Sequence, residues 1–282
     1  MKHRYTLILA ACICTLLAVL WQEANLIFLE NSSKVVHGMI KTTDDASYLL
    51  PPIHWLETGE WTDGSIGKSG YFQRPPGYGF LFLLSTLISS SKAYLILKLI
   101  QIVGFFASIL LVGKIVDRIG LNRNWTLIGA ISYGLLPCFS GFLYHSLTEG
   151  ITPFLLLWST YEWIKVVRNE GNYLRYTISN AFMLLVRPQL ALFALVFIVY
   201  FLWCRQKKAF WWSTLILLPF FCWQMRTMIL NEGIAGIHPI YSVTNQSLYR
   251  PPHQAITELF KVWEYRSDRF HETIGMLTAD SS

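Results

Sequence analysis

The apolar stretch Gly-Tyr-Gly-Phe-Leu-Phe-Leu-Leu-Ser-Thr-Leu-Ile-Ser-Ser-Ser, residues Gly77–Ser91, is the segment on which the expected topology depends. A helix that crosses a bilayer needs about 20 mostly apolar residues, and this stretch is shorter. Pro75 and Pro76 precede it and three serines end it, which is typical of a short helix with defined ends. We therefore predict a helix that lies in the membrane interface and does not span the membrane.

Seven other segments are long and apolar enough, or nearly so, to cross a bilayer. They are Tyr5–Leu29, Ala93–Ile115, Trp125–Tyr144, Ile151–Val167, Tyr173–Val186, Leu190–Cys204 and Ala209–Leu230. Of the 282 residues 53% are hydrophobic and 14% are charged, whereas soluble globular domains carry about 25% charged residues. This composition favours an integral membrane protein over a soluble protein with a large apolar core. The five cysteines lie in these apolar stretches without metal or redox spacing, and we expect them to be small buried side chains.

The first apolar segment has two interpretations. Lys2, His3 and Arg4, followed by an apolar run, are also typical of a cleaved secretory signal peptide. No Ala-x-Ala cleavage site follows, and apolar residues resume at 26–29. An uncleaved first span is therefore favoured over a signal peptide.

Short basic clusters separate the apolar segments. They are Lys2–Arg4, Arg118 with Arg123, Arg168 with Arg175, and Arg205 with Lys207 and Lys208. If Gly77–Ser91 does not span, all four clusters fall on one side, which the positive-inside rule makes cytoplasmic. If it spans, the N-terminal cluster lies opposite the other three, so the interfacial alternative needs fewer assumptions. The clusters also account for the net charge of +6 without a basic face that would bind nucleic acid.

In this topology the unusual polar residues gather on the external side. They are Asp44, Asp45, Arg74, His145, Glu149, Arg187, Arg226 and the polar tail 231–282. A membrane protein that collects acids and arginines at one water-facing end is expected to hold a functional site there. Helix capping by the aspartates and ion pairs within the bundle are the structural alternatives.

Two short motifs in the loops indicate which groups they could bind. Arg74 precedes two prolines that restrict the backbone, and an arginine so placed can bind a lipid phosphate through paired charge-assisted hydrogen bonds. His145 and Glu149 are four residues apart and share a face if their segment is helical. A zinc site would need further ligands that the sequence does not identify. A carboxylate that orients a sugar or an acceptor is therefore favoured, with a helix cap at Thr148 as the alternative.

The order of these motifs resembles that of the GT-C glycosyltransferases, in particular the aminoarabinose transferases acting on lipid A and the protein O-mannosyltransferases. The motifs are Asp44-Asp45-x-x-Tyr48, Thr58-Gly59-x-Trp61, Arg74-Pro75-Pro76-Gly77-Tyr78, Thr148-Glu149 and Arg187-Pro188. The resemblance covers residues 1–230 and implies an all-α membrane bundle of about seven transmembrane helices. Its first external loop, residues 30–92, would carry two juxtamembrane helices, Asp44–Thr58 and Gly77–Ser91. Residues 231–282 would form an external polar tail.

The resemblance also implies an activity and a set of site residues. The reaction would be an inverting transfer of a sugar from a polyprenyl-phosphate donor to a hydroxyl of a glycan, lipid or protein acceptor, at the non-cytoplasmic face of the inner membrane. The implied roles are catalysis by Asp44 and Asp45, donor-phosphate binding by Arg74, Arg187 and Arg226, and substrate orientation by Tyr48, Tyr78, His145 and Glu149. Asp44 would be the general base or a carboxylate that orients the acceptor. No motif requires a cofactor or a metal, although some GT-C enzymes use a divalent ion.

Two other functions are kept as alternatives. A transporter or flippase of lipid-linked sugars predicts polar residues at mid-membrane, whereas the polar residues here collect at one end. An inactive paralogue or assembly partner would tolerate loss of Asp44 and Arg74. GT-C chains commonly continue with further spans or an external domain, so a minimal enzyme and a fragment are both compatible with this chain.

Overall fold

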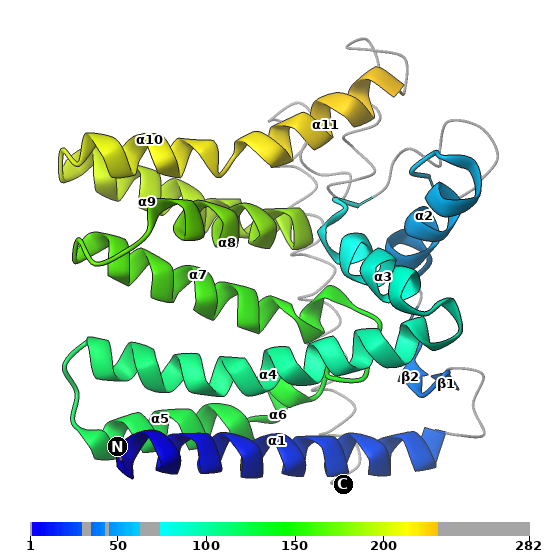
Figure 1. Cartoon of the computed structure of the whole chain (residues 1–282), viewed down its shortest axis with the longest axis horizontal. Coiled ribbons are helices and arrows are strands. Elements are labelled where there is room, and N and C mark those ends of the chain that lie inside the picture. Colours follow the sequence, from blue (N-terminus) through cyan, green and yellow to red (C-terminus); the bar gives the residue numbers. More distant parts are fainter. Residues whose placement is uncertain (1, 30–34, 43–44, 63–73, 231–282) are drawn as a thin grey trace, which may run out of the picture.

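The computed structural model describes residues 2–29, 35–42, 45–62 and 74–230, and every structural statement below refers to these residues. The fold is mostly helical, in agreement with the expected class (Figure 1). The helices are α1 (Lys2–Leu29), α2 (Asp45–Thr58), α3 (Gly77–Ile88), α4 (Ala93–Arg118), α5 (Arg123–Leu135), α6 (Pro137–Ser140), α7 (Thr152–Val167), α8 (Tyr173–Val186), α9 (Ala191–Trp203), α10 (Lys207–Leu215) and α11 (Leu218–Leu230). Short 3₁₀ turns are formed by Ser90–Lys92, Thr148–Gly150 and Pro188–Leu190. Two strands, β1 (Val35–Val36) and β2 (Met39–Ile40), pair as an antiparallel hairpin.

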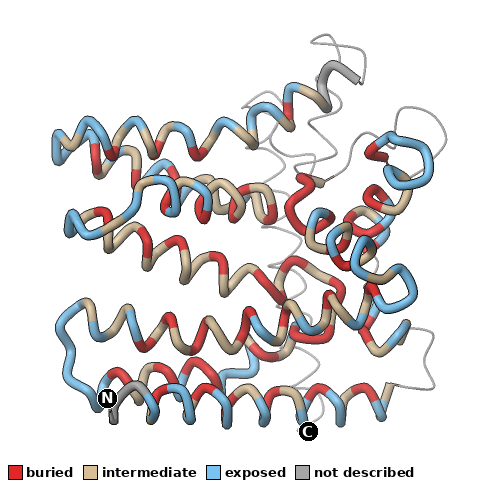
Figure 2. Tube along the Cα trace, in the orientation of Figure 1, coloured by how far each residue is buried: buried red, intermediate tan, exposed pale blue. Residues whose placement is uncertain are grey.

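The long helices lie side by side, from α1 at one edge of the molecule to α10 and α11 at the other (Figure 1). Neighbouring pairs such as α1 with α5, α4 with α7, and α7 with α8 pack against each other. The hairpin, α2 and α3 all lie at one end of the bundle, and the N-terminus of α1 lies at the opposite end. Buried residues line the helix faces that meet. Along α1 and α10 buried positions alternate with exposed ones (Figure 2).

Two of the expected spans are each divided in two. The segment Trp125–Tyr144 contains α5 and α6, because Leu136 is extended (ψ 119°) before Pro137, which begins α6. The segment Ala209–Leu230 is divided between α10 and α11, just ahead of Pro219. Two helical segments of the described chain are long and apolar enough to cross a membrane, namely Tyr5–Leu29 and Ser90–Arg118.

The two short helices of the first loop lie close to where the sequence predicts them. Helix α2 ends at Thr58, and Gly59 closes it with a positive φ of 81° and a hydrogen bond from its N–H to the carbonyl of Trp55 (2.9 Å). Helix α3 begins against the end of α8, since a Cβ added at Gly77 would lie 2.5 Å from the carbonyl carbon of Leu185. This contact places the segment before α3 beside the residues that follow α8.

The expectation that all five cysteines are buried is wrong. Only Cys14 is buried, and it packs against Gly134 of α5, where an added Cβ would lie 2.7 Å from the Cys14 Cβ. The other four cysteines are exposed.

Candidate functional site

The predicted site residues that the structure describes gather at the end of the bundle that carries α2 and α3, although Arg226 lines a different cavity there from the others. They come from the start of α2, the segment before α3, the loop 144–150 and the end of α8. Backbone hydrogen bonds join the loop 144–150 to strand β2, which precedes α2. The N–H of Ile40 in β2 donates to Tyr144 O (2.8 Å), and the N–H of Ser146 donates to Ile40 O (3.3 Å). The predicted base Asp44 lies outside the described residues.

Asp45 is enclosed by the protein. Its residue is only 2% exposed, and its carboxylate accepts hydrogen bonds from the Oγ1 of Thr42 (2.6 Å) and the Oγ of Ser146. Both hydroxyls satisfy a carboxylate that would be costly to bury alone. Asp45 thus ties the start of α2 to the loop 144–150. It does not line the cleft described below, and its predicted catalytic role stays a prediction.

Tyr48 lines the cleft described below, and Tyr78 packs against Tyr48 without lining the cleft. Tyr78 is fully buried, and its hydroxyl accepts a hydrogen bond from Gln101 Nε2 (2.6 Å), which also donates to the carbonyl of His145 (3.1 Å). Burial, with the nearby charge of Asp45, raises the pKa of Tyr78 well above its ordinary value, so this phenol stays protonated. The two tyrosine rings meet edge to face at 5.6 Å.

Gln101 is a site residue that the sequence analysis did not identify. It is fully buried in α4, far along the chain from both of its partners. The sequence offers one indication of this role: Gln101 is the only residue with an amide side chain in the apolar run Ala93–Ile115. Such a side chain is expected to be hydrogen-bonded wherever it is buried, but the sequence does not say to which partner.

A narrow cleft of about 90 Å³ opens beside these residues. Its wall includes Tyr48, Arg74, Thr148, Glu149 and Arg187. The guanidinium of Arg74 lies over the Tyr48 ring, 5.2 Å from the ring centroid. Pockets for whole small molecules usually measure about 300–1,000 Å³, so this cleft suits a single small anionic group.

Glu149 and Arg187 form an ion pair across the cleft. Their closest N–O distance is 2.6 Å, and both side chains are 32% exposed. The Thr148 hydroxyl donates to Glu149 (3.1 Å) and accepts from Arg187 (3.3 Å), so it lies between the two charges. Burial alone would raise the pKa of the Glu149 carboxyl, but the hydrogen bond and charge of Arg187 lower it below the usual value. Arg187 therefore forms an ion pair within the bundle, with Glu149, which the sequence analysis gave as the structural alternative to a functional role.

His145 and Glu149 would share a face only in a helix, and that condition is not met. The segment from His145 to Leu147 is not helical, because His145 forms a β-bridge with Ile40, and a 3₁₀ turn begins only at Thr148. Thr148 makes no side-chain capping bond; its hydroxyl serves the ion pair instead. The His145 ring contacts Phe142 (5.4 Å between centroids). Burial lowers its pKa, an effect that the charge of Asp45 partly offsets, so the ring is neutral at pH 7.

Arg226 lies in a different place from the other predicted phosphate ligands. Its Nη2 donates to the carbonyl of Trp61 (3.4 Å), and its guanidinium lies 4.8 Å from the Trp223 ring centroid. It lines a separate cavity with Pro76, whereas Pro75 lines the cleft. Arg226 therefore lines one cavity with Pro76, and Arg74 and Arg187 line the other with Pro75.

Metal ligands do not cluster in the part of the chain that the structure describes: no three His, Cys, Asp or Glu side chains there are grouped closely enough to hold an ion. Comparisons of the chain with protein-family models, with curated proteins and with solved structures find no match.

Proposed function

We propose that this protein is a membrane glycosyltransferase of the GT-C type, which moves a sugar from a polyprenyl-phosphate donor to an acceptor hydroxyl with inversion. The observation that carries the proposal is the cleft in which Arg74 and Arg187, from segments more than a hundred residues apart, lie beside the carboxylate of Glu149. Cations that converge on a narrow cavity are what a phosphate-bearing donor requires.

The exposed apolar surface supports a place in the membrane. In the most apolar part of α1, and likewise of α4, only 33% of the residues are buried. A helix in the core of a soluble protein would be buried on most of its surface. Large side chains such as Phe28 and Trp203 are each 87% exposed, and contiguous exposed apolar surface marks a membrane or partner contact. We infer seven crossings, made by α1, α4, α5 with α6, α7, α8, α9, and α10 with α11.

The placement of the connecting loops supports the inferred sidedness. The connections after α4, α7 and α9, which carry the basic clusters, lie at the same end as the N-terminus (Figure 1). The cleft lies at the opposite end, with α2 and α3. Under the positive-inside rule the basic end is cytoplasmic, and the cleft faces the exterior.

The proposed reaction is a direct displacement at the anomeric carbon of the sugar. The acceptor oxygen forms a bond to that carbon while the bond to the donor phosphate breaks, and the phosphate keeps the electron pair. Arg74 and Arg187 stabilise the charge that the phosphate gains. The acceptor proton passes to a carboxylate, which we assign to Asp44 from its place in the motif; Asp45 holds the adjoining start of α2 in position. Because the cleft is small, the sugar and the acceptor would lie at its mouth.

An apolar groove supports a lipid-linked donor. It measures about 380 Å³ and runs between α4 and α7, with Leu81 of α3 and Phe182 of α8 in its wall. Ile151, two residues after Glu149, also lines it, so the groove begins next to the cleft. A polyprenyl chain could lie there while its phosphate reaches Arg74 and Arg187.

The proposal is tested by measuring sugar transfer from a set of polyprenyl-phosphate sugars with the purified protein. We compare the wild type with Asp44→Asn, Arg74→Ala and the control Arg123→Ala, which removes an exposed arginine at the opposite end. Loss of a general base or of a charge-stabilising group should lower transfer by about a hundredfold or more, and the control should retain wild-type transfer.

Each remaining outcome argues against a specific part of the proposal. Wild-type transfer that survives both variants would contradict the assigned site. Absence of transfer with every donor, from protein that is monodisperse and helical, would contradict the enzyme. Movement of a fluorescent lipid-linked sugar across proteoliposomes would then favour the transporter.

A further inference from the structure

A second, larger cavity lies at the end of the bundle opposite the cleft. It measures about 560 Å³ and opens between α1, α4 and α7. Leu7 and Ile8 of α1 form one wall, and Tyr161 of α7 contributes to another. Since α1 begins and α4 ends at this end, opposite α2 and α3 (Figure 1), the cavity lies at the end of the bundle that carries the basic loops.

The lining of this cavity changes from apolar to charged along α4, where Lys114, Asp117 and Arg118 lie at its outer end. Leu110, Lys114 and Arg118 all line it and are spaced four residues apart, so they share one face of the helix. Leu110 lies deeper in the bundle, whereas Arg118 is the last residue of α4. A groove that is apolar at depth and carries Lys114 near its outer end matches the shape and charge of a lipid with an acidic head group.

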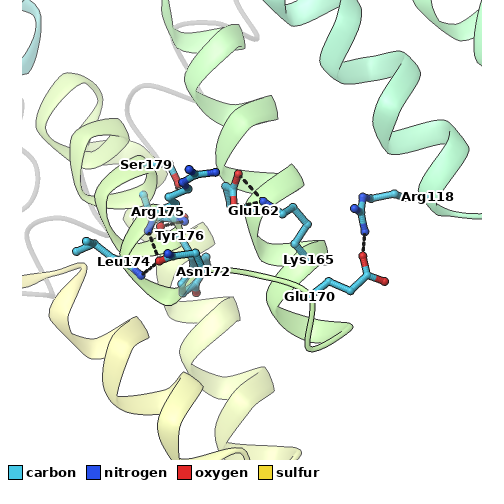
Figure 3. A network of polar contacts seen from close by, with 10 residues as sticks. Arg118, Glu162, Lys165, Glu170, Asn172, Leu174, Arg175, Tyr176 and Ser179 are labelled. Atoms are coloured by element: carbon cyan, nitrogen blue, oxygen red, sulfur yellow. Dashed lines mark hydrogen bonds and ion pairs between the residues drawn. The ribbon is translucent and has the colours of Figure 1, made fainter. Parts of the chain in front are cut away.

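The acidic side chains around the cavity already have partners (Figure 3). Glu170 forms an ion pair with Arg118, and Glu162 forms one with Lys165 at 2.9 Å. Asp117, which also lines the cavity, accepts a hydrogen bond from the Thr126 hydroxyl.

Lys114 differs from these charges. It is exposed and has no acidic partner among the described residues; its ammonium lies 6.0 Å from the centroid of the Tyr161 ring. A cation one turn inside an apolar helix is costly in a membrane unless something compensates its charge. An anion in the groove would do so.

We propose that this groove binds an acidic phospholipid of the surrounding bilayer, with Lys114 contacting its phosphate and Leu7, Ile8 and Leu110 contacting its acyl chain. The proposal depends on the membrane placement inferred above, but not on sugar transfer. A failed transfer assay therefore leaves it unchanged, and its own failure leaves the transfer proposal unchanged.

Native mass spectrometry of the full chain tests the proposal. The purified protein is titrated with phosphatidylglycerol and, separately, with phosphatidylcholine of the same acyl chains. The variants are Lys114→Gln, Lys114→Arg, the groove-filling Ile8→Trp, and the matched control Lys208→Gln. Lys208 is also an exposed lysine near a tyrosine ring (4.9 Å from the Tyr173 centroid), but it lies outside the groove.

We expect the wild type to bind phosphatidylglycerol more tightly than phosphatidylcholine. Lys114→Gln should weaken phosphatidylglycerol binding about fivefold, since one basic side chain at a membrane surface contributes about that factor. Lys114→Arg and Lys208→Gln should bind it as the wild type does, and Ile8→Trp should weaken binding of both lipids. Equal binding of the two lipids by the wild type, unchanged binding by Lys114→Gln, or an equal loss in Lys208→Gln would overturn the proposal.

Discussion

Hydroxyl groups hold both carboxylates of the candidate site in place. Thr42 and Ser146 donate to Asp45, and Thr148 donates to Glu149. Thr42 and Ser146 did not stand out in the sequence, because serines and threonines are common in loops and most of them hydrogen-bond to backbone or water. Thr148 did stand out, but as a possible helix cap. Ser146 and Thr148 do flank residues that were predicted, so the neighbourhood was identified while the contacts within it were not.

The ion pair of Glu149 with Arg187 should make stability depend on pH. Its stabilisation is fully present above the unfolded-state pKa of about 4.3 and is lost as the pH falls through the lower folded-state pKa. Because both side chains are about a third exposed, solvent screening limits the contribution to about 1 kcal/mol or less. Glu149→Gln should therefore lower the thermal unfolding midpoint more at pH 7 than at pH 3. The exposed Glu57→Gln serves as the control, and an equal deficit of Glu149→Gln at both pH values would contradict the pairing.

The start of α3 depends on a close approach between two helices. The backbone of Gly77 lies against the last turn of α8, at Leu185 and Val186, with no room for a side chain. This contact sets the distance between Arg74 and Arg187, since Pro75 and Pro76 leave the intervening backbone little freedom. The cleft is thus a consequence of how α3 and α8 pack.

Gly77→Ala should destabilise the protein by about 1–3 kcal/mol, because its Cβ would meet backbone atoms that cannot move aside as a side chain can. Gly129→Ala in α5 is the matched control: the nearest atom to its Cβ is a valine methyl group at 3.4 Å, and alanine favours a helix. Thermal unfolding of the two variants in detergent measures the difference. Equal midpoints would show that α3 and α8 do not pack this closely.

The molecule as a whole has two chemically different ends. One carries the cleft, with α2, α3 and the hairpin; the other carries the N-terminus and the basic connections (Figure 1). Two connections lie at the same end of a bundle only if the chain runs along its length an even number of times between them. The basic connections meet this condition because α3 packs across the end of the bundle, against α4 and α8, and does not run along its length.

Cysteine labelling in intact cells should distinguish the two ends. In a background without the five native cysteines, Glu57→Cys in α2 should react with a membrane-impermeant maleimide, since it is exposed at the cleft end. Leu121→Cys, exposed between α4 and α5, should react only after permeabilisation. The expected orientation follows from the positive-inside rule. Equal labelling of both sites in intact cells would contradict it.

Local features of the sequence predicted most of the helices. Long apolar runs predicted α1 and α4, and Pro75-Pro76 predicted the start of α3. These predictions succeeded because an apolar run and a proline act on the backbone within a few residues. The breaks before Pro137 and Pro219 were missed, although the prolines are visible, because hydropathy averaged over a segment does not register one residue that interrupts it.

The partners within the site are contacts between distant parts of the chain. Gln101 meets Tyr78, Ser146 meets Asp45, and Glu149 meets Arg187 across separations of 23 to 101 residues. Composition and motif order were enough to predict a mainly helical chain with its polar residues collected at one end. Which carboxylate is enclosed, which one pairs with an arginine, and why Arg226 lies apart depend on the packing of α3, α4 and α8. Sequence spacing does not encode that packing, since the same apolar faces could meet at several rotations and depths.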